Sequence, residues 1–422
     1  DWPGLLQLAG KDTDALTLIL RQRGLNFAPG EEWGYSNSGF VLLKEIVART
    51  SGMSFSEFAR KRLFEPLGMK STAYVDDLRD VLKNRALAYE KEGNRWKQDM
   101  LLGDDRGGDG ALFSTAGDLV IWNEALTSAR LGASVIEKLQ EPAMLNNGRK
   151  LGIARGLFLD TVRGTREVSY TGSAAAYKAW LGRYPEKGLS IAILCNAGES
   201  ANRTLYARRI FDLVVPATGA PAAQADPPAA VASGTGAAEL NLSSKAGLFF
   251  SERTREPLRL AVNDGRLRVA GGPFLVPVTQ DRFRRLGALF QFMSGDEFEL
   301  HFMSPDEFEL RSMEGQSTRY RRAQPYAPTA ADLAAFAGRY ESDEMRSVFQ
   351  MTSGKDGLMI RLNDSPAPGF EFRPVDRDTF QRGMMTVRFR RDEAGKVVAL
   401  DYSNPAVRNI RFTRLSDRPS RR

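Results

Sequence analysis

The sequence predicts an α+β protein in which a region of mixed helices and strands is followed by two small, related β-barrel-like units. Three observations predict this organisation. Residues 1–216 alternate helical and strand patterns, residues 217–237 are dominated by Ala, Pro and Gly, and residues 238–418 contain short strand-like runs broken by turn signals. A chain of 422 residues is also too long for one compact core. We therefore expect a first domain over 1–216, a linker over 217–237, and β units over 238–324 and 325–418.

The first region carries helix and strand signals in a clear order. Apolar periodicity and capping residues predict helices over Asp14–Gln22, from an N-cap at Ser38 to about Thr50, from the capping box at Ser54–Glu57 to about Pro66, and over Asp118–Leu126 behind Thr115. Strand-like runs then follow at Leu157–Val162, Glu167–Tyr170, Lys178–Tyr184 and Leu189–Cys195. Pro185–Gly188 predicts a hairpin connection, and a closing helix is expected over about Ala201–Val214.

The second half contains an internal duplication. Ala246-Gly247 recurs as Ala337-Gly338, and Arg319–Arg322 recurs as Arg411–Arg414. A repeat of roughly ninety residues predicts two similar β units, each a small barrel or sandwich.

Composition excludes several classes of function. The net charge of +7 is spread along the chain without a basic stripe, so no nucleic-acid partner is expected. No apolar run approaches the length of a membrane span. Cys195 is the only cysteine, lies in an apolar run and is expected to be a buried structural thiol. With His301 the only histidine, the first half cannot build a Ser-His-Asp triad, and no metal site or cofactor is expected.

A Tyr-x-Asn turn is the first motif that could carry chemistry. Tyr35 lies at the entry to a helix and could relay a proton if nearby positive charge lowers its pKa. Asn37 offers an amide donor and acceptor that could orient a substrate amide. The tripeptide alone is weak, because Tyr402-Ser403-Asn404 repeats it without a following helix.

Two further motifs follow along the chain. Tyr170-Thr171-Gly172-Ser173 ends a strand in small residues, where a substrate could approach the backbone and the N–H of Ser173 could face a developing oxyanion. Without further context, an ordinary strand end is the better interpretation of these residues. Gly108–Thr115 is rich in glycine before a helix, and a structural wall is the simpler interpretation.

Taken together and in order, these segments resemble the family of class C β-lactamases, penicillin-binding DD-peptidases and related esterases. The resemblance rests on Asn26–Thr72, Gly110–Leu119 and Tyr170–Asn196, and it covers most of residues 1–216. It implies part of a β-lactamase/DD-peptidase-like domain, an antiparallel sheet flanked by helices. The duplicated tail is similar to the lipocalin-like C-terminal domains attached to such hydrolases.

The resemblance also implies roles for individual residues. Tyr35 matches the family tyrosine that relays the proton, and Asn37 matches the residue that binds the substrate amide. Tyr170-Thr171-Gly172 matches the Lys-Thr-Gly or His-x-Gly motif, and Ser173 matches the donor of an oxyanion N–H. The implied function is a serine hydrolase that acts through an acyl-enzyme on a small-molecule or peptide substrate, in the bacterial periplasm or cell envelope. The C-terminal β units could also mediate self-association.

The chain departs from the family pattern twice. No Ser-x-x-Lys occurs in the 422 residues, and only 34 residues precede Tyr35. We therefore expect a chain truncated at its N-terminus, and no turnover by the family mechanism from these residues alone. Tyr170 also stands where lysine or histidine is usual, and tyrosine is neutral at pH 7. Esters and small amides thus become better candidates than β-lactams, and a non-catalytic member that binds cell-wall peptide or another ligand is the alternative.

Overall fold

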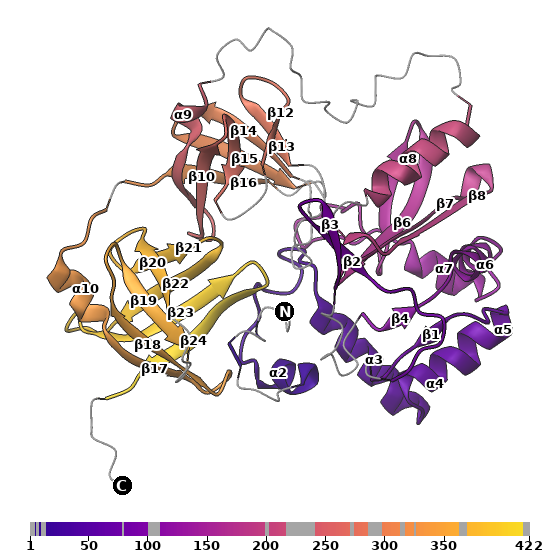
Figure 1. The fold of residues 1–422 in the computed structure, drawn as a ribbon, viewed down its shortest axis with the longest axis horizontal. Coiled ribbons are helices and arrows are strands. Elements are labelled where there is room, and N and C mark those ends of the chain that lie inside the picture. Colours follow the sequence, from indigo (N-terminus) through magenta and orange to yellow (C-terminus); the bar gives the residue numbers. More distant parts are fainter. Residues whose placement is uncertain are drawn as a thin grey trace. The chain divides into compact units, whose positions relative to one another are not determined.

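The computed structural model describes residues 5, 8–9, 14–77, 80–99, 110–198, 202–216, 241–270, 274–285, 298–312, 317–324, 326–362 and 369–416. Their contacts divide the chain into two bodies (Figure 1). The mixed body holds Gly39–Ser233, and the β body holds Asp1–Ser38 together with Gly234–Arg422. This grouping differs from the domain expected over 1–216, whose boundaries remain a prediction. The expected linker falls within residues 217–240, outside the described residues.

The helices of the mixed body follow their capping residues. α4 (Phe55–Ala59) begins behind Ser54, whose hydroxyl accepts the N–H of Glu57 at 3.2 Å. The helix continues as a π-helical turn over Arg60–Phe64 and as α5 (Glu65–Leu67), which ends at Gly68 with φ of 80°. α6 (Ala116–Thr127) is capped by Thr115, as predicted, and α7 covers Ala133–Leu139. None of the described helices is long and apolar enough to cross a membrane.

The helix after Tyr35 begins one residue earlier than expected. α3 runs over Asn37–Ser51, so Ser38 lies within its first turn and the N-cap prediction at Ser38 is wrong. The boundary between the two bodies falls between Ser38 and Gly39, inside that first turn. The contacts of Tyr35 and Asn37 therefore place them in the β body, although the helix that follows them belongs to the mixed body.

A four-stranded antiparallel sheet forms the centre of the mixed body. Its strands lie in the order β5 (Phe158–Val162), β6 (Thr165–Ala174), β7 (Tyr177–Tyr184) and β8 (Leu189–Cys195). α8 (Arg203–Val214) covers one face and α6 the other (Figure 1). The face toward α8 carries an apolar cluster, in which Trp180, Tyr184 and Phe211 are each at most 2% exposed. These elements confirm the predicted α+β class with an antiparallel sheet flanked by helices.

Two short strand pairs were not predicted from the sequence. β1 (Ala73–Tyr74) pairs with β4 (Leu112–Phe113), and β2 (Tyr89–Glu92) pairs with β3 (Arg95–Gln98). Strands of two to four residues are too short to show an alternation of apolar and polar side chains.

Within the described residues the β body contains two β units of eight strands each, and the duplication predicted the two units. The first is an antiparallel sheet behind α9 (Leu242–Lys245), and the second is a closed barrel behind α10 (Ala330–Phe336). The sheet strands are β9 (Gly247–Ser251), β10 (Pro257–Asn263), β11 (Arg266–Val269), β12 (Val276–Pro277), β13 (Arg282–Arg285), β14 (Phe298–Ser304), β15 (Glu307–Ser312) and β16 (Ser317–Arg322). The barrel strands are β17 (Gly338–Ser342), β18 (Ser347–Ser353), β19 (Leu358–Leu362), β20 (Phe370–Pro374), β21 (Thr379–Arg382), β22 (Met385–Arg391), β23 (Val397–Asn404) and β24 (Val407–Arg414).

The chain's N-terminal segment packs on the closed barrel. α2 (Ala15–Arg21) lies within the helix predicted over Asp14–Gln22, and Asp14 caps it. Its Leu18 is fully buried in the same apolar cluster as Phe336 and Phe349 of the barrel unit. This packing explains why residues 1–38 group with the β units by their contacts.

The repeated residues close each β unit in the same way. Gly247 and Gly338 follow the short helices with φ of 147° and 145°, a conformation that favours glycine. In the first unit, Arg322 donates to the carbonyl oxygens of Ser244 at 2.6 Å and Ala246 at 2.8 Å. The equivalent Arg414 of the barrel donates to the carbonyl oxygens of Ala335 at 3.0 Å and Ala337 at 2.5 Å. The last strand of each unit is thus fastened to the helix that precedes its first strand by an arginine latch.

We predict that Arg414→Met lowers the unfolding free energy of the closed barrel by roughly 2–3 kcal/mol, because the carbonyl groups lose a charged donor. Arg361→Met is the matched control, since Arg361 is exposed on the same barrel. Scanning calorimetry of both variants measures the effect. Equal melting temperatures for the two variants would show that the latch contributes nothing.

Candidate active site

The Tyr-x-Asn turn is formed where an extended segment enters α3. Tyr35 lies half-buried two residues before the helix, and Asn37, only 6% exposed, is its first residue. Gly34 is needed beside Tyr35 because a Cβ at this position would lie 3.1 Å from the ring of Phe27. The turn therefore has little room to move on the side of Phe27.

The second motif lies inside β6 and is held in register by β7. Tyr170 faces Leu181 of β7, Gly172 faces Ala179, and Ser173 faces Lys178. β5 supplies register partners only for Thr165–Ser169, so the segment from Tyr170 onward forms an edge of the described sheet on that side. The ring of Phe158 on β5 stacks on the ring of Tyr170, with 5.3 Å between the ring centroids and an interplanar angle of 13°.

Strand alternation divides this motif between two faces. Thr171 and Ser173 lie on the face of Trp180, their neighbour on β7, and Trp180 packs in the apolar core beneath α8. Tyr170 and Gly172 lie on the opposite face. A ligand on the face of Tyr170 would therefore meet the aromatic side chain and the strand backbone, but not the hydroxyl groups of Thr171 and Ser173.

Lys178 supports the motif from the α8 face. Its Nζ donates to Oγ of Ser173 at 2.6 Å, and the residue is only 6% exposed. Sequence reasoning missed this contact because a single lysine in a strand is ordinarily solvent-exposed. The one available signal was its place in the apolar run Tyr177–Tyr184.

A buried ionic network fixes α8 against the same face. Glu167, 2% exposed, accepts hydrogen bonds from Tyr184 at 2.5 Å, from Ser169 at 3.1 Å and from Arg208 of α8. Burial and the hydrogen bond to Glu167 both raise the pKa of Tyr184. Burial alone would lower the pKa of Arg208, but the charge of Glu167 outweighs it and the pKa is raised. Tyr184 therefore stays neutral and Arg208 stays positively charged at neutral pH.

The structure groups the expected site residues in two sets. Tyr35 lies next to Asn37 in the β body, and Tyr170–Ser173 lie together in the mixed body. Of the glycine-rich segment, Gly110–Thr115 leads through β4 into the cap of α6, whereas Gly108 and Asp109 lie outside the described residues. The roles expected of all these residues remain predictions.

The cysteine and the histidine lie on strands outside the two motifs, and Cys195 is the register partner of Lys178, the residue that contacts Ser173. Cys195 is half-buried at the end of β8 rather than fully buried, and His301 lies on β14 of the first β unit. No group of three or more His, Cys, Asp or Glu residues suited to a metal ion occurs within the described part of the chain.

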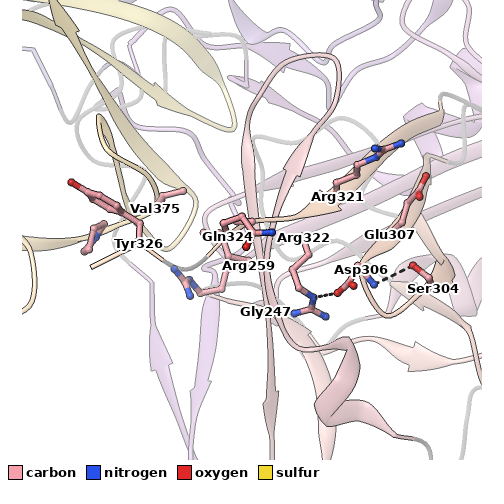
Figure 2. A pocket seen from close by; sticks show the side chains of 13 residues that line it. Gly247, Arg259, Ser304, Asp306, Glu307, Arg321, Arg322, Gln324, Tyr326 and Val375 are labelled. Atoms are coloured by element: carbon pink, nitrogen blue, oxygen red, sulfur yellow. Dashed lines mark hydrogen bonds and ion pairs between the residues drawn. The ribbon is translucent and has the colours of Figure 1, made fainter. Parts of the chain in front are cut away.

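A pocket of about 740 Å³ lies in the β body, distant in sequence from every expected site residue (Figure 2). It is lined by polar and charged side chains, and Arg322 in its wall pairs with Asp306 at 2.6 Å. The pair belongs to the arginine latch, so at least this part of the pocket wall has a structural role. The lining residues are Gly247, Leu248, Arg259, Ser304, Asp306, Glu307, Arg321, Arg322, Ala323, Gln324, Tyr326, Pro374 and Val375.

The model of the Beta-lactamase family matches residues 3–214, about half of the chain and the part that holds both motifs. The chain belongs to the Beta-lactamase family, and this places it in a superfamily of serine hydrolases.

Curated relatives match different parts of the chain. Penicillin-binding protein 4* of Bacillus subtilis is 29% identical over 202 residues, which are 43% of this chain and 44% of that protein. The D-aminopeptidase of Brucella canis is 21% identical over 423 aligned residues, which cover 95% of this chain and 74% of that protein. The chain therefore spans less than half of the first relative and about three quarters of the second.

Solved structures give weaker similarity. The octameric penicillin-binding protein homologue from Pyrococcus abyssi has a TM-score of 0.40 at 19% identity, with 70% of this chain and 66% of that chain covered. A D-amino acid amidase from Ochrobactrum anthropi has a TM-score of 0.36 at 24% identity, with 46% and 65% covered.

We predict that Lys178→Met lowers the unfolding free energy of the mixed body by roughly 1.5–3 kcal/mol, because the hydroxyl of Ser173 loses a buried charged donor. Lys187→Met, at an exposed residue of the β7–β8 connection, is the control. Urea unfolding followed by tryptophan fluorescence measures both, since Trp180 lies on the same strand as Lys178. A loss no greater than that of the control would contradict the prediction.

Proposed function

We propose that this chain is part of a serine hydrolase that works through an acyl-enzyme and cleaves small amides or peptides at a D-amino acid. The family membership supports the class of reaction. The alignment with a D-aminopeptidase along 95% of the chain, including both β units, supports the substrate class. In this proposal the nucleophile and its lysine lie outside these 422 residues, which contain no Ser-x-x-Lys.

The proposal gives each motif a role. Tyr35 passes the proton between the nucleophile and the leaving group, and the amide of Asn37 orients the scissile amide. The backbone N–H of Ser173 donates to the oxyanion, while its hydroxyl is held by Lys178 on the other face of the sheet. Gly172 has no side chain and so leaves the strand accessible to the substrate backbone. The side chain of Thr171 points to the other face of the sheet, so in this proposal only its backbone lies beside the substrate.

The side chain of Tyr170 is the main support for the proposed substrate class. Its neutral phenol stands where the family usually has lysine or histidine, and it stacks on Phe158. A stacked neutral ring offers no fixed positive charge to a substrate carboxylate, whereas it can contact an apolar side chain and donate one hydrogen bond. An aminopeptidase or amidase substrate needs no carboxylate beside the scissile bond, so this site suits it better than it suits a β-lactam.

A non-catalytic binding protein is the second candidate. Tyr170 and the absence of Ser-x-x-Lys from these residues favour it. Such a protein would use the same residues to bind a cell-wall peptide or another ligand without cleaving it.

A place in the bacterial cell envelope follows from the same reasoning. The relatives named above include a penicillin-binding protein and D-aminopeptidases of bacteria, which supports an envelope or periplasmic location. Self-association through the β units, which sedimentation of the intact protein would measure, is also proposed.

The test uses the full-length gene product, with D-alanine amide and L-alanine amide as substrates and a fluorophosphonate probe as the label for an active serine. We expect labelling, preference for the D-amide, and a loss of roughly 10²- to 10⁴-fold in kcat for Tyr35→Phe, because a phenylalanine cannot transfer the proton. Tyr206→Phe, at an exposed tyrosine of α8, is the control and should leave kcat unchanged.

Well-folded protein that is neither labelled nor active on either amide would overturn the catalytic proposal in favour of the binding protein. Preference for the L-amide, or for a β-lactam, would overturn the proposed substrate class alone.

A further inference from the structure

The segment that precedes Tyr35 is fastened to the β units at several points. Asn26 makes two hydrogen bonds with the β23–β24 turn of the closed barrel, from its Nδ2 to the carbonyl oxygen of Ala406 at 3.0 Å and from the N–H of Arg408 to its Oδ1 at 2.9 Å. These partners lie about 380 residues apart in the chain. The conformation of this segment is therefore fixed by contacts with the β body as well as by its neighbours in the sequence.

Glu32 is the charged centre of this attachment. Its side chain is only 9% exposed and lies between two guanidinium groups, Arg253 from the first β unit and Arg408 from the closed barrel. Arg408 reaches both carboxylate oxygens, at 3.2 and 3.3 Å. An exposed ion pair contributes little, but a buried carboxylate that loses its partners is strongly disfavoured. We call these three residues the Glu32 clamp.

The clamp is connected to Tyr35 through one aromatic ring. The guanidinium group of Arg408 lies over the ring of Phe27, 5.9 Å from its centroid. The same ring lies against Gly34, where no Cβ fits without displacing it. Arg408 thus touches both Glu32 and the ring that limits the residue before Tyr35.

The pH dependence of the clamp follows from the pKa of Glu32. Burial alone would raise this pKa, but hydrogen bonds and charge from Arg253 and Arg408 outweigh it, and the pKa lies below its ordinary value of 4.5. A lowered pKa in the folded protein gives stability that is present above the unfolded pKa and is lost as the pH falls through the folded pKa. The other titratable groups within electrostatic reach of the two arginines are Glu31, Glu256 and Tyr320.

We therefore predict that the difference in melting temperature between wild type and Glu32→Gln is largest at neutral pH and shrinks below pH 4.5. The two proteins differ only in the side chain at position 32, so a pH-dependent difference between them reports on the charge of Glu32. If the difference in melting temperature stays constant from pH 7 to pH 3, the negative charge of Glu32 does not contribute to its binding by the two arginines.

We propose that Glu32 is a positioning residue, through which the two β units set the conformation of the Tyr35–Asn37 turn. The β units act on the reaction without touching the substrate, because an arginine from each holds the carboxylate three residues before Tyr35. The catalytic meaning of this clamp rests on the proposed function, whereas its effect on the turn does not.

The experiment compares Glu32→Gln with Asp343→Asn in the full-length gene product. Asp343 belongs to the same body and makes an ion pair with Arg23 in which both side chains are about 70% exposed, so it controls for the loss of a surface carboxylate. Hydrogen exchange followed by mass spectrometry is read in peptides covering residues 26–36. We expect roughly tenfold faster exchange there for Glu32→Gln only, with residues 43–51 of α3 unchanged.

Steady-state kinetics with D-alanine amide then show whether the Glu32 clamp positions Tyr35 for catalysis or only holds the segment to the β units. Displacing the proton relay should lower kcat roughly 10- to 100-fold while KM changes little. Arg408→Met should reproduce this loss, and Arg408→Lys should restore part of kcat because it keeps the positive charge. Unchanged exchange in residues 26–36 would overturn the clamp, and faster exchange with unchanged kcat would overturn its role in catalysis. Inactive wild-type protein would contradict the proposed function. The exchange rates in residues 26–36 would still show whether the Glu32 clamp holds the turn.

Discussion

The pairing of β6 with β7 is the constraint on which the mixed body's motif depends. In an antiparallel pair the register decides which side chains share a face, and a shift of one residue would exchange the two faces. Such a shift would turn Tyr170 toward the apolar core beneath α8 and bring Ser173 out of it. The register is secured from both sides of the sheet. Asn123 of α6 donates to the carbonyl oxygen of Gly182 at 3.0 Å, and α8 is held to β6 by its ionic network.

Arginine serves a structural purpose throughout this basic chain. Glu32 is shared by two arginines, and Asp401, 2% exposed on β23, accepts from Arg390 at 2.6 Å and also from Arg411. Glu299 of β14 likewise faces two arginines of β13. A carboxylate held by two guanidinium groups leaves one positive charge over at each such place. These three sites therefore give the arginines that form them a structural role.

Local signals predicted the fold well where the chain folds on itself over short distances. Thr115 and Ser54 cap their helices as expected, because a cap is made by residues three positions apart. Ser38 failed as a cap because α3 begins one residue before it. The duplication predicted two β units, and the structure gives each of them eight strands.

Contacts between distant residues could not be predicted in the same way. Glu32 meets partners 221 and 376 residues further along the chain, and nothing in its own neighbourhood identifies them. Lys178 resembles any surface lysine until β7 is placed in register with Ser173. The family motifs named Tyr35 and Tyr170 as a pair, whereas only the contacts show that one belongs with the β units and the other with the sheet.

The position of Arg408 on β24 also determines when the Glu32 clamp can form during synthesis. Arg408 is synthesised 376 residues after Glu32. A nascent chain therefore carries an unfastened Tyr35 turn until β24 has been synthesised. The turn can take its clamped conformation only after the strand that carries Arg408 is in place.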